Sequence, residues 1–249
     1  MQKVEGSSPF SRFVPRRSQT RQPDTARALR HVNCCSPAGY RSIFGGKSLQ
    51  REARRYRREG LTGSAAWLLG ALRDDGVTDR SVLEVGGGIG GLQLELLDAG
   101  ASHVTNVEII DSYESVARSL ITEHRVEDRV ERHVADYARC SDQTPPADIV
   151  VMHRVICCYP DPDALISAAC SRAHDRVAIT IPRETWWVRL AFAAMNAWLR
   201  LRQIAFRGYI HPERRLLERA DSFGFHAARH DHGVVWQSFI LQRATVGED

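Results

Sequence analysis

The sequence predicts an α/β fold: a doubly wound, mostly parallel sheet that ends in an antiparallel hairpin and is preceded by a helical arm. Two observations predict it. From residue 81 onward, short apolar runs typical of buried strands alternate with stretches of helical spacing. The last two runs, Phe225–His230 and Val234–Leu241, instead flank a His232-Gly233 turn, as in a β-hairpin. With 249 residues and 43% hydrophobic content, the chain is long enough for one domain with an extension.

Two segments of different character precede this domain. Residues 1–33 are rich in Arg, Ser, Gln and Pro and lack hydrophobic periodicity, so we expect a disordered basic tail. Residues 34–75 are predicted to form a helical arm with one helix from Ser48 to Arg58, capped by the Ser48 side chain, and another from Gly63 to Arg73. We expect this arm to form a lid over a ligand site or to pack on the sheet edge. Residues 76–249 form the main domain.

Charge is unevenly distributed along the chain. Residues 1–60 hold 14 Lys and Arg against 4 Asp and Glu, whereas the remaining residues hold 20 against 26. A basic arm on an acidic body fits an anionic partner, such as a nucleic acid, a lipid surface or an acidic substrate. It fits a solvated tail and helix face equally well.

The stretch Ser81–Gly91 is interpreted as a buried strand, a tight glycine turn and the start of a helix that ends near Gly100. Glycine suits such a turn because it adopts positive φ and leaves the backbone amides open to a ligand. The free N–H groups at the helix start then face a cofactor. The glycines of this turn are Gly86, Gly87, Gly88, Gly90 and Gly91.

Two cofactor classes fit these glycines. The spacing Gly86-x-Gly88-x-x-Gly91 matches the dinucleotide fingerprint. However, Glu84 stands on the strand two positions before the first glycine, and a carboxylate there would repel phosphates. A carboxylate suits a cofactor that brings a sulfonium and an ammonium group.

The remaining elements follow in order. An Asp111-x-x-Glu114 capping box is predicted to start a helix after the second strand. A helix across Thr185–Phe206 carries an apolar stripe and a polar stripe, and we expect it to pack on the core, with cover for a large hydrophobic substrate or contact with a membrane surface as alternatives. Parallel strands are expected at His103–Glu108, Val130–Val134, Asp148–Met152 and Arg176–Ile181.

The segment Val82–Gly90 resembles the first motif of the class I S-adenosylmethionine-dependent methyltransferases, whose acidic residue occupies the place of Glu84. In an open parallel sheet, ligands bind beyond the carboxyl ends of the strands. Glu108 ends the second strand, where a carboxylate accepts both ribose hydroxyls. The resemblance implies that Asp136 reads the adenine amino group and that Tyr137 stacks beside it. It also implies S-adenosyl-L-methionine as the cofactor.

More of the chain, roughly Pro37–Arg243, resembles the magnesium-protoporphyrin O-methyltransferases. The shared features are Gly39-Tyr40 and Phe44-Gly45, the glycine motif, the Val155–Pro160 loop and the final hairpin. In that family an arm tyrosine and a histidine just before Tyr-Pro are proposed to act on the substrate carboxylate. Tyr40 matches the first of these, but Cys158 stands in place of the histidine. The resemblance therefore supports membership of the family but does not support a porphyrin substrate.

His153 begins the loop after the fourth strand, where a neutral imidazole would take a proton from a substrate or hold the methionine end of the cofactor, unless it is structural. We expect no metal site. The alternatives are thiolate ligation by the pairs Cys34-Cys35 and Cys157-Cys158, and ligation by histidines that share one strand face, His226, His230 and His232.

The six cysteines include no CxxC, and no apolar run is long enough for a signal peptide or a membrane span, so we expect a cytoplasmic protein. The leading hypothesis is O-methylation of a small-molecule acceptor, for which a hydrophobic compound is one option, with at most peripheral membrane contact and no nucleic acid. One alternative is an NAD(P)-dependent reductase, which the glycine fingerprint favours. The other is a nucleic-acid methyltransferase that uses the basic arm, although few aromatic residues stand among its arginines.

Overall fold

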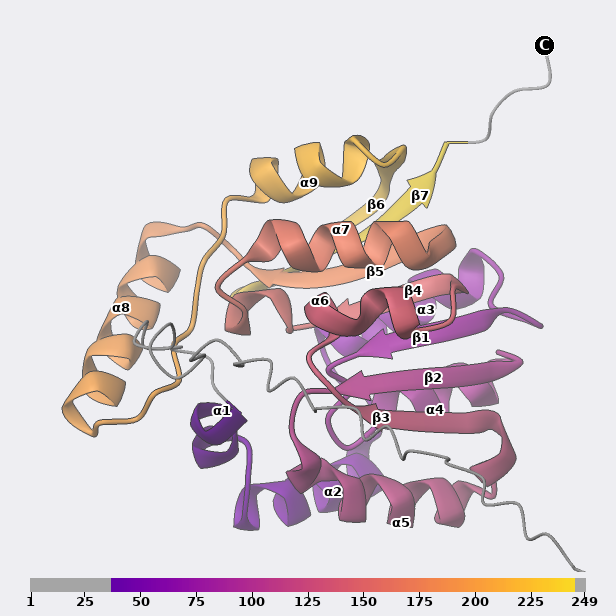
Figure 1. Cartoon of the computed structure of the whole chain (residues 1–249), viewed down its shortest axis with the longest axis horizontal. Helices are drawn as coiled ribbons and strands as arrows, with labels where there is room; N and C mark the ends of the chain where they lie inside the picture. Colours follow the sequence, from indigo (N-terminus) through magenta and orange to yellow (C-terminus); the bar gives the residue numbers. More distant parts are fainter. Residues whose placement is uncertain (1–36, 245–249) are drawn as a thin grey trace, which may run out of the picture. The chain divides into compact units, whose positions relative to one another are not determined.

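A computed structural model describes residues 37–244 of the chain. Within them, seven strands form one sheet in the order β3-β2-β1-β4-β5-β7-β6 (Figure 1). The first five run parallel to their neighbours, while β7 is antiparallel to both β5 and β6. The doubly wound sheet with a terminal hairpin is thus confirmed. The strands are β1 Ser81–Val85, β2 His103–Glu108, β3 Val130–Val134, β4 Ala147–His153, β5 Ala173–Pro182, β6 Phe225–His232 and β7 Trp236–Arg243.

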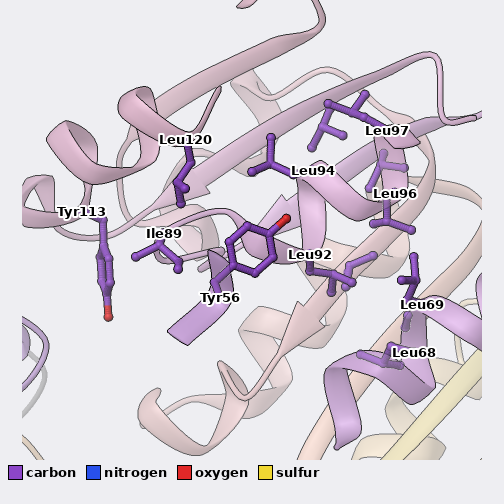
Figure 2. Packing of buried hydrophobic residues seen from close by; sticks show 14 of the residues in the cluster. Tyr56, Leu68, Leu69, Ile89, Leu92, Leu94, Leu96, Leu97, Tyr113 and Leu120 are labelled. Carbon is purple, nitrogen blue, oxygen red and sulfur yellow. The ribbon is translucent and has the colours of Figure 1, made fainter. Parts of the chain in front are cut away.

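Helices cover both faces of this sheet because successive residues of a strand point to opposite sides. Val82 of β1 belongs to a core shared with α2 to α5, part of which Figure 2 shows around Tyr56 and Leu92. Leu83, the next residue, belongs to a second core shared with α6, α7 and α9. The helices are α1 Pro37–Ile43, α2 Lys47–Glu59, α3 Ser64–Asp74, α4 Gly91–Asp98, α5 Glu114–His124, α6 Tyr137–Cys140, α7 Pro162–Arg172, α8 Trp186–Leu201 and α9 Glu213–Asp221.

Two predicted helix caps are wrong. Ser48 lies inside the first turn of α2, where its hydroxyl donates to the Gly45 carbonyl at 2.8 Å instead of accepting from a forward N–H. Asp111 opens a short 3-10 turn and pairs with Arg41 at 2.9 Å. Glu114 pairs with an arginine of β3, so the expected capping box does not form. Ser48 thus bonds to a carbonyl three residues before it, and the two acids pair with arginines that are distant in the sequence.

The predicted packing of α8 is also wrong. Only Val188 and Leu199 of this helix are buried. The amide of Asn196, on the predicted polar stripe, exchanges two hydrogen bonds with the backbone of Gly208, at 2.8 and 2.9 Å. These bonds hold Asn196 against the protein, although Arg189 and Arg200 of the same stripe are exposed, and most of the predicted apolar stripe faces outward. No helix within residues 37–244 is long and apolar enough to cross a bilayer.

Candidate active site

The turn between β1 and α4 is the tightest part of the site. Gly86, Gly88 and Gly90 adopt φ of 67°, 56° and 85°, the left-handed region that favours glycine. A Cβ on Gly87 would lie 2.1 Å from the Asn106 amide nitrogen and 2.3 Å from a Glu84 carboxylate oxygen. No side chain fits at that position, so the backbone of the turn stays bare. This cradle, together with the buried acids beside it, fits an adenosyl cofactor.

Glu84 lies directly beneath the turn. Its side chain is 2% exposed, and the Asn106 Nδ2 donates to its Oε2 at 2.9 Å. Burial raises the pKa of Glu84 to about 7, although the nearby Arg132 opposes the shift. The residue also lines a cavity of about 420 Å³ together with Gly86, Gly87 and His153. A cation bound in this cavity would favour the ionised carboxylate.

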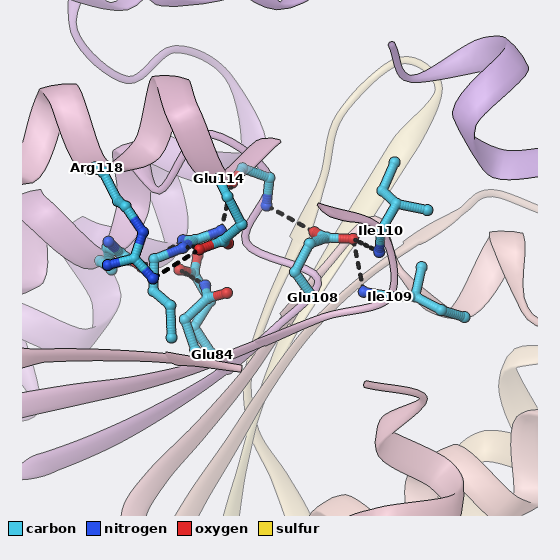
Figure 3. Close-up of polar contacts among 10 residues, drawn as sticks. Glu84, Glu108, Ile109, Ile110, Glu114 and Arg118 are labelled. Atoms are coloured by element: carbon cyan, nitrogen blue, oxygen red, sulfur yellow. Dashed lines mark hydrogen bonds and ion pairs between the residues drawn. The ribbon is translucent and has the colours of Figure 1, made fainter. Parts of the chain in front are cut away.

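Glu108 ends β2 and holds the other side of the turn (Figure 3). Its Oε2 accepts from the Gly88 N–H at 3.0 Å, and its Oε1 accepts from the N–H groups of Ile109 and Ile110 at 2.8 and 3.3 Å. Burial raises the pKa of Glu108, and these three donors counteract the rise. The backbone thereby fixes the carboxylate at the wall of a cavity of about 330 Å³.

Asp136 and Tyr137 follow β3 and line a third, narrower cavity. The Tyr159 hydroxyl donates to both Asp136 oxygens, at 3.1 and 3.2 Å. Tyr137 is 3% exposed, and its hydroxyl donates to the Ala168 carbonyl in α7 at 3.1 Å. Adenine recognition by Asp136 and stacking by Tyr137 remain predictions; an amino group at Asp136 would replace or share the bond from Tyr159.

His153 lies at the end of β4, between the two larger cavities. Its Nε2 is 3.0 Å from the Ser64 hydroxyl, which also receives a hydrogen bond from Arg154 at 3.1 Å. Because Arg154 donates to Ser64, the arrangement that satisfies both groups has Ser64 donating to Nε2. Burial, with the Arg154 charge, lowers the pKa of His153 to about 3. The imidazole is therefore neutral across the physiological range.

The arm residue Tyr40 meets the loop after β4. Its hydroxyl donates to the Cys158 carbonyl at 2.5 Å, so the structure brings together two residues that the family resemblance singles out. Tyr40 and Phe44 pack against Phe206, with ring centroids 5.6 and 5.3 Å apart. Both arm residues and Cys158 line the cavity of about 330 Å³. Helices α1 and α2 thus reach the site, and so does the start of α3 through Ser64, while Leu68 and Leu72 of α3 pack on the sheet.

The three cavities share one residue, Gly86. Asp136 borders the narrow cavity, Glu108 the cavity of about 330 Å³ and Glu84 the cavity of about 420 Å³. The acids therefore follow one another around the glycine turn in the order that adenine, ribose and methionine would need.

The glycine turn is supported by Arg132, a residue that was not predicted from the sequence. Arg132, in the middle of β3, has a side chain that is 2% exposed. Its guanidinium donates to Glu114 at 2.9 Å, to the Gln93 amide oxygen at 3.2 Å and to the Gly88 carbonyl at 3.0 Å. An arginine in the middle of a short strand with a valine at each end was the only signal. Arg132 joins α5, α4 and the glycine turn in one polar network.

We expect Arg132→Met to destabilise the protein by about 3 kcal/mol because Glu114 and the Gly88 carbonyl lose a buried donor. Urea unfolding measures the change. Arg118→Met is the matched control: Arg118 pairs with the same Glu114 but is 70% exposed, so its loss should cost under about 0.5 kcal/mol. Equal effects from both substitutions would show that the buried Arg132 network does not stabilise the protein.

Other predicted site features lie apart from this region or outside the description. Within residues 37–244, no three His, Cys, Asp or Glu side chains are placed to hold a metal ion. Cys157 and Cys158 have sulfur atoms 3.7 Å apart, while Cys34 and Cys35 lie outside the described residues, as does the predicted tail of residues 1–33. Of the strand histidines, His226 pairs with an aspartate of α9 and His230 stacks on Phe239.

Comparison with known proteins shows that the chain is similar to methyltransferases. A family model described as a methyltransferase domain matches residues 50–230. No curated protein sequence matches the chain. Among solved structures, the magnesium protoporphyrin IX methyltransferase ChlM from Synechocystis PCC 6803 with bound SAH is similar, with a TM-score of 0.65 and 19% identity over 82% of this chain and 98% of that one.

Two further solved structures are similar. An O-methyltransferase family protein from Burkholderia thailandensis has a TM-score of 0.64 and 16% identity, over 90% of this chain and 68% of that one. The 1,6-didemethyltoxoflavin-N1-methyltransferase of the same organism, with bound 1,6-didemethyltoxoflavin and S-adenosylhomocysteine, has a TM-score of 0.60 and 16% identity, over 84% and 88%. At these identities the likeness shows the fold.

Proposed function

We propose, because the chain belongs to the methyltransferase domain family, that it transfers a methyl group from S-adenosylmethionine to an oxygen of a small organic molecule. The single observation that carries this proposal is the bare glycine turn held between two buried carboxylates, Glu84 and Glu108. When bound, the cofactor supplies an activated methyl group on a positively charged sulfur. The protein then has to align the acceptor with that methyl group.

Different residues hold different parts of the cofactor. Glu108, fixed by three backbone N–H groups, accepts from the ribose hydroxyls, and Asp136 with Tyr137 holds the adenine. Glu84 provides negative charge below the turn at the methionine end. Gly86, Gly87, Gly88 and Gly90 allow the backbone to approach the ligand closely. Glu84 is buried beneath the turn and shielded from water, which strengthens its attraction for a cation.

The acceptor occupies the cavity of about 330 Å³, whose walls include Tyr40, Phe44, His153 and Cys158. The lowered pKa of His153 makes its imidazole a poor base, which favours a role in holding a ligand by a hydrogen bond. An acceptor oxygen that is already ionised at neutral pH needs no base. Tyr40 fixes the loop that carries Cys158 and closes the aromatic wall, which suits an apolar acceptor.

The alternatives fit the chain less well. A nicotinamide enzyme would place its pyrophosphate beside Glu84, and its sheet would lack the antiparallel β7 between β5 and β6. A nucleic-acid methyltransferase needs a basic surface at the mouth, whereas Glu52, Glu84 and Glu108 line the two larger cavities here.

The proposal is tested by calorimetry on the full-length protein with S-adenosylmethionine, S-adenosylhomocysteine and NADH. Binding of the first two and not the third is expected. Cell extract incubated with the enzyme and methyl-labelled cofactor should then yield a labelled small molecule by mass spectrometry. Absence of binding by both adenosyl compounds would refute the function, and label found only on RNA would assign the acceptor to nucleic acid.

A further inference from the structure

Helix α8 presents an apolar face that the described part of the chain leaves uncovered. Trp186, Leu190, Trp198 and Leu201 are 76%, 62%, 53% and 81% exposed. Their spacing of four, eight and three residues places them along one side of a helix. Large side chains exposed in this number on one helix mark a surface that contacts something apolar.

The sequence that contains α8 is strongly basic. Residues 183–207 contain five arginines and a single acid, Glu184, while the rest of residues 61–249 contains 15 arginines and 25 acids. Glu184 is itself paired with Arg189 at 2.6 Å. The guanidinium of Arg202 lies over the Trp198 ring at 5.6 Å. An apolar face bordered by arginines is complementary to a negatively charged lipid surface.

The sequence that precedes α1 is also basic. Residues 1–36 hold seven Lys and Arg against two Asp and Glu. They join the described structure at α1, where Tyr40 packs on Phe206, five residues after the end of α8. Helix α1, which follows this basic sequence, therefore lies next to the segment that follows α8.

The position of α8 connects this surface to the active site. β5 ends at Pro182 and α8 begins at Trp186, so the helix projects from the edge of the sheet where the parallel strands end (Figure 1). Phe206 packs against Phe44, and Phe44 lines the acceptor cavity. A surface that binds α8 would thus lie near the mouth of that cavity.

We propose that α8 docks the protein on anionic lipid bilayers, with Trp186, Leu190, Trp198 and Leu201 in the headgroup region and the flanking arginines on lipid phosphates. This inference goes beyond the methyl-transfer function and does not depend on it. Docking presents the acceptor cavity to molecules that partition into the lipid. A second copy of the chain is the competing occupant of the same face.

Co-sedimentation of the full-length protein with vesicles tests the proposal without cofactor or acceptor. Vesicles of phosphatidylcholine with about 30% phosphatidylglycerol should bind about tenfold more protein than vesicles of phosphatidylcholine alone. The double variant Leu190→Ser with Leu201→Ser should lower binding about tenfold. The control Val234→Ser removes an apolar side chain that is 76% exposed in the β6–β7 turn and should leave binding unchanged.

Both variants alter exposed residues, so their melting temperatures should stay within about 2 °C of the unmodified protein. Trp fluorescence should shift to the blue on addition of anionic vesicles, and the double variant should lose most of this shift. Three results would overturn the proposal. They are no binding to anionic vesicles, binding that survives the double substitution, and light scattering that shows a dimer which the double substitution dissociates.

Discussion

Replacing Gly87 with alanine is expected to abolish binding of S-adenosylmethionine at practical concentrations. The new Cβ would lie 2.1 Å from Asn106 and 2.3 Å from Glu84, so the hydrogen-bonded pair below the turn would have to separate or the turn would have to rise. Either movement displaces the backbone that faces the cofactor. We expect affinity to fall about a hundredfold or more, and stability to fall by about 1–3 kcal/mol from overpacking.

Gly70→Ala is the matched control for this substitution. Gly70 lies in α3, and a Cβ built on it has no neighbour within 4 Å. Because alanine favours helix over glycine, this variant should be more stable by about 0.5–1 kcal/mol and bind the cofactor as the unmodified protein does. Calorimetry measures both affinities. A Gly87→Ala protein that binds within about threefold of the original would show that the turn does not hold the ligand.

Glu84→Gln should separate stability from binding. The pKa of Glu84 is raised from 4.5 to about 7 in the folded protein, so the folded state binds more protons between these values. Stability is therefore lost as pH rises from about 4.5 through 7, by on the order of 3 kcal/mol. Glutamine cannot ionise, so it removes this loss of stability at higher pH. It still accepts from the Asn106 Nδ2, and the Asn106 Oδ1, which lacks a partner, is available to the new amide.

At pH 8 the unliganded Glu84→Gln protein should consequently melt at a higher temperature, while its affinity for S-adenosylmethionine should fall about tenfold or more. In the unmodified protein, affinity should rise as pH increases toward 7 and then level off, because the cation favours the ionised carboxylate. The variant should show no such rise. Calorimetry across pH 5.5–8.5 checks both expectations. Unchanged affinity in the variant would remove Glu84 from the site.

Much of the fold could be predicted because it depends on local patterns. The strand predicted at Val130–Val134 matches β3, and the final hairpin forms as the His232-Gly233 turn predicts, although its turn begins one residue later. The glycine turn could be placed because its sequence is short and contiguous. Glu84, Glu108 and Asp136 could be ordered around it because parallel strands end at one edge.

What could not be predicted depends on contacts between distant segments. The Asn196 side chain of α8 bonds to the backbone of Gly208. The hydrophobic periodicity of α8 does not show that this side of the helix contacts the protein. Arg132 supports a turn that precedes it by more than 40 residues. The capping box failed for the same reason, since Asp111 pairs with Arg41 and Glu114 with Arg132. The Ser48 cap failed for a local reason, because its hydroxyl donates to the Gly45 carbonyl three residues before it.

The order of the strands has a consequence for how the chain folds during synthesis. β7 follows β6 in the chain, yet it lies inside the sheet, between β5 and β6. Until Trp236–Arg243 has emerged, β5 has no partner on that side, and its buried residues Ile179 and Ile181 remain at an open edge. The nascent protein therefore carries an aggregation-prone edge while the residues between Pro182 and Trp236 are synthesised, and this edge closes when β7 pairs with β5.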